Sequence, residues 1–146
     1  MTTVRGCNIP EDLHYLVDKH VWARVDGEEI VVGLSDVAQR LSKTVVSVTL
    51  KSAGKQVAKG KSLATVESSK WVGPVPSPVT GEIVAVNQAL AGAPGTLNRD
   101  PYGDGWIARI RPEDWAADSQ ALVTGAPGVE AYQRFLEAEG IVCEGD

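Results

Sequence analysis

One lysine lies in a stretch whose composition differs from the rest of the chain. Lys70 stands within the run E-S-S-K-W-V-G-P-V-P-S-P-V-T-G, which spans residues 67–81. The glycine and prolines of this run exclude a helix, and the alternating residues 63–67 and 82–87 on either side favour strands. We therefore expect Lys70 at or near the tip of a hairpin, with its amine held out in water. A lone exposed lysine is in most proteins only a solvated charge, so its context decides.

The sequence around Lys70 resembles the lipoyl-attachment region of the H proteins of the glycine cleavage system. The matching runs are G-K-S-L-A-T-V-E-S-S-K and S-P-V-T-G-E-I-V-A-V-N, and the resemblance extends over roughly residues 13–115. It implies that the ε-amine of Lys70 carries lipoic acid as an amide. It also implies that a lipoate-protein ligase reads Glu67. Biotin, the competing group on such a hairpin, normally requires methionine on both sides of the lysine, where this chain has Ser69 and Trp71.

The chemistry of a lipoyl group explains why an exposed tip would be needed. A five-membered disulfide ring cannot reach the dihedral angle that relaxed disulfides prefer, so it is readily reduced and exchanges with thiolates. Tethering the ring raises its effective concentration in each partner's active site. The resemblance therefore implies a carrier and not an enzyme. An enzyme using Cys7 or Cys143 with a histidine has no supporting motif, and an unmodified adaptor would be distinguished by intact mass.

Three further residues are candidates for the same cofactor-binding site. Trp71 directly follows the lysine, and an exposed indole there would be a contact for the ligase or a partner enzyme. Gly81 is a turn glycine on the downstream side of the hairpin, as Gly60 is upstream. His20 is either a polar contact in the groove where the arm docks or a structural histidine with its hydrogen bonds satisfied. No residues are assigned as catalytic or as metal ligands.

Two positions depart from the H-protein pattern and divide the possible pathways. The family usually has a serine and a glutamate, which receive the amino group of the methylamine carried on the arm, where this chain has Lys19 and Val21. A lysine would repel a cationic arm. We therefore expect a divergent H-like lipoate-binding protein whose dithiol carries sulfur or electrons, resembling those of sulfur oxidation through a heterodisulfide-reductase-like complex. The alternative is a glycine cleavage H protein, which carries aminomethyl groups from glycine decarboxylase to aminomethyltransferase. Dihydrolipoyl dehydrogenase is a partner in both.

Composition limits the partners and the compartment. The 146 residues are 43% hydrophobic, as expected for a single domain with a real core, and the net charge of −5 argues against nucleic acid or an anionic membrane as partner. No apolar run approaches a membrane span and the N-terminus lacks a signal region, so cytoplasm is the default. Cys7 and Cys143 are interpreted as free thiols in a reducing compartment, or as a pair that meets if the termini pack together.

The remaining pattern predicts a mainly β fold. Residues 21–25 and 29–33 alternate around Asp26-Gly27, a signal for a type I′ hairpin. Residues 44–50 and 106–111 are further strands, and residues 88–105 are expected to form a long surface connection.

Two helical segments are expected around these strands. Residues 34–40 form a short helix with Ser35 as N-cap, and residues 112–140 form a helical C-terminal extension that ends at Gly140. By resemblance, the single domain of residues 1–146 is the barrel-sandwich hybrid of lipoyl domains, with its core at about residues 13–115. This fold has two small antiparallel sheets, short peripheral helices and a C-terminal helix, with the lysine hairpin at one end.

Overall fold

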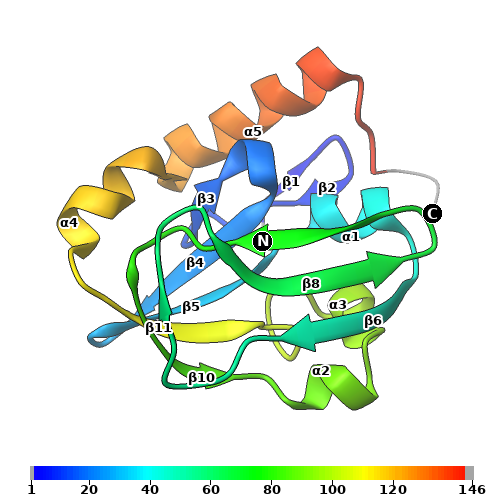
Figure 1. The fold of residues 1–146 in the computed structure, drawn as a ribbon. Helices are drawn as coiled ribbons and strands as arrows, with labels where there is room; N and C mark the ends of the chain where they lie inside the picture. The colour runs from blue at the N-terminus through cyan, green and yellow to red at the C-terminus, as the bar shows by residue number, and fades with distance from the viewer. Residues whose placement is uncertain (1, 144–146) are drawn as a thin grey trace.

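Antiparallel sheets form the framework of the protein in the computed structural model, which describes residues 2–143 (Figure 1). A seven-stranded sheet has the order β12-β3-β4-β5-β11-β10-β7, a three-stranded sheet has the order β6-β8-β9, and β1 and β2 form a separate ribbon. The strands are β1 (Thr3–Val4), β2 (Cys7–Asn8), β3 (His14–Leu16), β4 (Val21–Asp26), β5 (Glu29–Leu34), β6 (Val45–Leu50), β7 (Gln56–Val57), β8 (Ser62–Ser68), β9 (Val72–Pro76), β10 (Gly81–Val86), β11 (Ala108–Pro112) and β12 (Val123–Thr124). The predicted mainly β fold with short helices and a C-terminal helix is confirmed.

The helices are short except for the last. The α-helices are α1 (Asp36–Ser42), α2 (Ala89–Gly92), α3 (Thr96–Arg99), α4 (Trp115–Asp118) and α5 (Gly125–Glu139), and the 3-10 turns are η1 (Val17–Lys19) and η2 (Ser119–Ala121). The predicted N-cap of α1 is confirmed, because the side chain of Ser35 accepts a hydrogen bond from the backbone N–H of Ala38.

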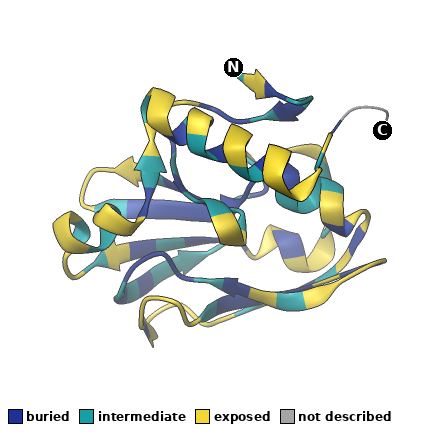
Figure 2. Ribbon diagram, turned by 90° about the horizontal axis from the view of Figure 1, so that it is seen from above, coloured by how far each residue is buried: buried dark blue, intermediate teal, exposed yellow. Residues whose placement is uncertain are grey.

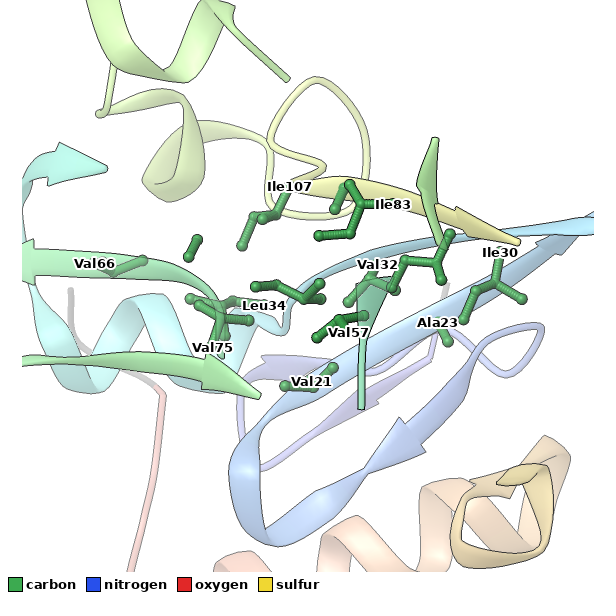
Figure 3. Close-up of a cluster of buried hydrophobic side chains, with 14 of the residues drawn as sticks. Val21, Ala23, Ile30, Val32, Leu34, Val57, Val66, Val75, Ile83 and Ile107 are labelled. Carbon is green, nitrogen blue, oxygen red and sulfur yellow. The ribbon is translucent and has the colours of Figure 1, made fainter. Parts of the chain in front are cut away.

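The larger apolar cluster joins the two main sheets. Leu34 on β5, Val66 on β8 and Val75 on β9 pack in it together with Val57 and Ile83, and all five are buried (Figure 3). Complete burial of one aliphatic side chain contributes roughly 1.5–3 kcal/mol. This cluster therefore fixes the three-stranded sheet, and with it the lysine hairpin, against the rest of the molecule.

The β4–β5 hairpin forms as predicted, but its turn is displaced by one residue. Asp26 pairs with Glu29, so the turn residues are Gly27 and Glu28, and of these only Gly27 has a positive φ, of 65°. The predicted type I′ turn at Asp26-Gly27 is therefore wrong. Asp26 and Glu29 both form ion pairs with Arg109 on β11, at 2.8 and 3.2 Å, and these favour the observed register.

The partner strand of the lysine hairpin differs from the one that the sequence suggests. The strand β8 pairs with β9, whereas β10, the alternating segment after the prolines, belongs to the seven-stranded sheet beside β11 and β7. The strand β9 contains Pro74 and Pro76 and lies at the edge of its sheet. An edge strand tolerates proline because one side of its backbone needs no ladder hydrogen bond. The two prolines are therefore the reason that the sequence did not predict this strand.

The segment expected to be a surface connection carries two helices. Leu90 in α2 and Leu97 in α3 are fully buried against the larger cluster. Helices this short have no stability of their own, so burial of their leucines holds them in place. Their pattern is too brief to be recognised among the surrounding glycines and prolines.

The C-terminal helix α5 covers the N-terminal ribbon and the strand β3. Exposed and buried residues alternate along it (Figure 2), and Tyr132 and Leu136 are fully buried in a second apolar cluster. The predicted helical extension over residues 112–140 is only partly correct, because Pro112 ends β11 and the strand β12 separates α5 from the shorter helices. Its predicted end is confirmed, because Gly140 adopts the left-handed conformation with φ 69° as the C-cap of α5.

The two cysteines form a disulfide, and both are buried. The prediction of free thiols is therefore wrong. The backbone N–H of Cys143 donates to the carbonyl of Arg5 at 2.9 Å, and the Arg5 Nε donates to the carbonyl of Ile141 at 2.8 Å. These contacts hold the chain after α5 against the N-terminal ribbon. The sulfurs meet because the termini pack together, which spacing alone does not show.

The disulfide generates a prediction about stability. The variant with Cys7→Ala and Cys143→Ala should lose about 2–4 kcal/mol of unfolding free energy, because a cross-link over 136 residues restricts the unfolded chain. Urea denaturation with and without a reducing agent measures this. Reduced wild-type protein serves as the control and should approach the double variant. Equal unfolding free energies for the oxidised wild type, the reduced wild type and the double variant would contradict the prediction.

Candidate functional site

A serine organises the tip of the hairpin that carries Lys70. The hydroxyl of Ser68 accepts hydrogen bonds from the backbone N–H groups of Lys70 at 3.3 Å and Trp71 at 3.0 Å. It also lies 3.1 Å from the carbonyl of Trp71, which accepts the Ser68 backbone N–H at 2.8 Å. The backbone N–H of Ser69 donates to the carbonyl of Thr44 at 3.0 Å, just before β6. Lys70 is thus an exposed residue on a turn whose backbone is fixed from both sides.

Ser68 was not among the predicted site residues. A serine at the start of a turn is a known sequence signal for that turn, because its hydroxyl can hydrogen-bond to the backbone of the residues that follow. The neighbouring serine at position 69 made that signal ambiguous. The burial of Ser68 and the exposure of Ser69 distinguish the two in the structure.

Trp71 folds back over its own strand. Its side chain is 42% exposed, and its indole lies against Gly73, where a Cβ atom would come within 2.8 Å of the indole Cε2. Only a glycine leaves that space. The expected exposed indole beside Lys70 is therefore present, and it occupies the space that Gly73 leaves open.

Glu67 lies on the outer face of the three-stranded sheet. It pairs with Ser47 on β6 and Val72 on β9 and is exposed, whereas its neighbour Val66 is fully buried. Its carboxylate is therefore accessible to a protein that approaches the tip from outside.

A cavity of about 640 Å³ opens beside Lys70. Its walls come from η1, α1 and β9, together with the loop at Gly60. The apolar part is formed by Leu34, Ala38, Leu41, Pro74 and Pro76, and the polar part by Asp18, Lys19, His20, Ser42 and Lys70, with Trp71 at the tip. The structure thus brings together three of the predicted site residues, Lys70, Trp71 and His20, although fifty positions separate the histidine from the lysine.

The side chain of His20 is held by the C-terminal helix. Its Nδ1 lies 2.8 Å from the hydroxyl of Tyr132, and its ring makes an edge contact with Phe135 at 5.3 Å between centroids. Burial lowers the pKa of His20 from 6.5 to about 4, an effect that the nearby carboxylate of Asp18 partly offsets. The imidazole is therefore neutral at pH 7. Its backbone is left-handed, with φ 58°.

Val21 and Gly81, which the sequence singled out, lie away from the cavity wall. Val21 is 1% exposed and packs in the larger apolar cluster, so of the two departures from the H-protein pattern only Lys19 reaches the cavity. Gly81 begins β10, where a Cβ atom would collide with the carbonyl group of Arg111 on β11. The structure thus gives Gly81 a place in the scaffold, where it allows two strands to approach closely.

The described residues add two observations on other kinds of site. Within residues 2–143, no group of three or more histidine, cysteine, aspartate or glutamate side chains is arranged to hold a metal ion. In the same part of the chain, no helix has the length and apolar character needed to cross a membrane.

Fold and hairpin together define a class. The chain is a barrel-sandwich protein that presents a lysine at a hairpin tip. It belongs to the glycine cleavage H-protein family, whose model matches residues 14–138.

Relatives and a solved structure resemble most of the chain. It is 44% identical over 147 aligned positions to "Glycine cleavage system H protein 5" of Aquifex aeolicus, covering 98% of this chain and 99% of that one. It is 40% identical to "Probable glycine cleavage system H protein 2" of Sulfolobus acidocaldarius, covering 99% and 98%. The crystal structure of a glycine cleavage system H protein from Mycobacterium marinum superposes with a TM-score of 0.73 at 30% identity, covering 91% of this chain and all of that one.

The lowered pKa of His20 predicts an acid-dependent loss of stability. Between pH 6.5 and about pH 4, His20 is protonated in the unfolded state but stays neutral in the folded state. The free energy of unfolding therefore decreases as the pH is lowered through this range. Between about pH 7 and about pH 4.5 this costs about 2 kcal/mol. In the His20→Asn variant, the acid-dependent loss of unfolding free energy measured by urea denaturation should be smaller by that amount. Asparagine is chosen because it tolerates the left-handed backbone at this position.

His14→Asn is the matched control for this measurement. Burial also lowers the pKa of His14, but its ring packs on Trp115, away from the cavity. The variant retains His20 and should keep the larger part of the acid-dependent loss. The same loss in wild-type protein and in His20→Asn would show that His20 is not its source.

Proposed function

We propose that this chain is a lipoyl carrier of the glycine cleavage type, with lipoic acid attached through an amide to Nζ of Lys70. The observation that carries the proposal is the position of Lys70, which is exposed on a rigid turn and opens onto a cavity with an apolar wall. Membership of the H-protein family and the names of the relatives support it. When bound, the lipoyl group supplies a disulfide that is reduced to a dithiol and carries a group between enzymes.

The described residues fit such a group. The apolar wall, with Leu34, Leu41 and Pro76, suits a hydrocarbon arm and a sulfur ring, while the open mouth leaves the tip of the hairpin accessible to partner proteins. The buried hydroxyl of Ser68 fixes the turn, so a ligase meets Lys70 in one geometry. Glu67 and the indole of Trp71 are exposed beside it and provide a charged and an aromatic contact.

The proposed partners follow from the glycine cleavage role. They are a lipoate-protein ligase, glycine decarboxylase, aminomethyltransferase and dihydrolipoyl dehydrogenase. The sulfur-oxidation function that the sequence favoured receives no support from the family model or from the relatives. The structural argument for that function is also weaker, because Val21 is a core residue and only Lys19 places an unusual charge at the cavity.

Mass spectrometry tests the attachment site. Protein made in a host with a matching ligase should gain one lipoyl group, and Lys70→Arg should abolish the gain because a guanidinium does not form the amide. Lys61→Arg, an exposed lysine in the bend just before β8, is the control and should be modified normally. With purified ligase, Glu67→Gln should be modified more slowly than wild type, at unchanged melting temperature. A lipoyl group that persists in Lys70→Arg contradicts the proposal.

Aminomethyl loading tests the pathway. Lipoylated wild-type protein should accept the aminomethyl group in a reconstituted glycine decarboxylase assay. Lys19→Ser should accept it several-fold faster, because it removes a positive charge from the cavity that receives a cationic cargo. Lys59→Ser, an exposed lysine outside the cavity lining, should leave the rate unchanged. Protein that is lipoylated and reducible but takes up no aminomethyl group would exclude the glycine cleavage role.

A further inference from the structure

A chain of three buried or partly buried polar groups ends at the cavity beside Lys70. The hydroxyl of Ser35 lies 2.9 Å from the hydroxyl of Tyr132, which lies 2.8 Å from Nδ1 of His20. Ser35 and Tyr132 are completely buried, and His20 lines the cavity. Since water does not reach the two hydroxyls, the protein itself must satisfy their hydrogen-bonding groups.

The direction of the hydrogen bonds follows from counting donors. The Ser35 oxygen already accepts the backbone N–H of Ala38 at 3.4 Å, and within residues 2–143 its own hydrogen has no acceptor other than Tyr132. Ser35 therefore donates to Tyr132. The Tyr132 hydroxyl then donates to Nδ1 of His20, which must be unprotonated to accept. In the opposite order the buried Ser35 hydrogen would have no acceptor, which costs about 1–3 kcal/mol.

The position of the ring is fixed as well as its tautomer. The carbonyl of His20 accepts the backbone N–H of Ser35 at 2.8 Å, and its N–H donates to the carbonyl of Val17 at 3.2 Å. The ring stacks on Tyr132 and meets Phe135 edge-on. Its Nε2 has no protein partner in the described part of the chain, so this N–H is available to a group in the cavity.

We propose that Tyr132 positions His20 as a neutral donor whose Nε2–H binds a hydrogen-bond acceptor on the arm attached to Lys70. The inference rests on the proposed function, since it requires the arm. The acceptor is either a sulfur of the reduced arm or the carbonyl oxygen of the amide that joins the arm to the lysine. A protonated amine does not accept a hydrogen bond, so the histidine holds the carrier arm itself and not a cationic cargo.

In the described part of the chain, no charged side chain is hydrogen-bonded to the His20 ring. Asp18 and Lys19 line the same cavity from η1 and oppose each other in charge. Lys70 loses its charge when the amide forms. Ser35, through its backbone at the N-cap of α1, and Tyr132 and Phe135 of α5 contact His20 and carry no charge. The neutral N–H is thus a directional donor among groups that act mainly through charge.

Nitrogen NMR on the unmodified protein tests the tautomer without the arm. Long-range 15N–1H spectra at neutral pH should show the His20 proton on Nε2, and Tyr132→Phe should shift this population toward Nδ1–H. Tyr15→Phe is the matched control: Tyr15 is also buried and bonds the carbonyl of Pro10 at 2.6 Å, so this variant should leave the His20 spectrum unchanged. A wild-type proton on Nδ1, or an unchanged tautomer in Tyr132→Phe, would overturn the inference.

The arm itself is tested with lipoylated protein. After reduction by dihydrolipoyl dehydrogenase with NADH as the electron donor, alkylation by iodoacetamide at the peptide containing Lys70 should be about two- to tenfold faster in Tyr132→Phe and His20→Asn than in wild type, as expected for one lost hydrogen bond. Tyr15→Phe should match wild type. Equal rates in all four proteins would overturn the inference, whereas absence of lipoylation at Lys70 would refute the proposed function and leave the tautomer result intact.

The redox state of the arm separates the two acceptors. The Nε2–H resonance of His20 is compared in unmodified, oxidised and reduced lipoylated protein. A change that appears only on reduction identifies a sulfur as acceptor, and an equal change in both lipoylated forms identifies the amide carbonyl. An identical resonance in all three forms would show that His20 does not bind the arm.

Discussion

The alternation of side chains along β8 is the constraint on which the presentation of Lys70 depends. Ala64, Val66 and Ser68 point inward and are buried, while Thr65 and Glu67 point outward and are exposed. A slip of one residue would exchange the two faces, placing a carboxylate in the core and a valine in water. The packing of Val66 between the sheets therefore sets the register that ends at the hairpin tip. The same register puts the Ser68 hydroxyl under the turn, where it holds the backbone of the lysine.

The cavity lies where independently packed parts of the molecule meet. One wall comes from the lysine hairpin, which the larger cluster holds. The other comes from η1 and α1, beside the second cluster that α5 completes. Tyr132 joins the second cluster to the η1 side of the cavity, since its ring is buried in that cluster while its hydroxyl reaches His20 in the cavity wall. The C-terminal helix thus determines the chemistry of a cavity in which it contributes no lining residue.

A carrier places different demands on a fold from those of an enzyme. In the described part of the chain, every buried side-chain nitrogen and oxygen has a hydrogen-bond partner, and the buried carboxylate of Asp36 accepts the backbone N–H of Asn8 together with side chains of its own helix. Such satisfied polar groups rigidify a structure. Rigidity would suit the proposed carrier role, in which one lysine is offered in one geometry to several partners, because a fixed tip loses little conformational entropy on each encounter.

The sequence alone determined the features that depend on local order. The spacing of glycines and prolines around Lys70, the Ser35 cap, the apolar period of α5 and the family motif were all readable, because each involves residues close along the chain. The strand β9 was missed because edge position, which only the sheet defines, makes Pro74 and Pro76 acceptable. The disulfide, the burial of Val21 and the approach of His20 to Lys70 depend on contacts between distant segments. Tertiary structure decided these, since the free energy that brings them together comes from burying two shared apolar clusters and not from any local pattern.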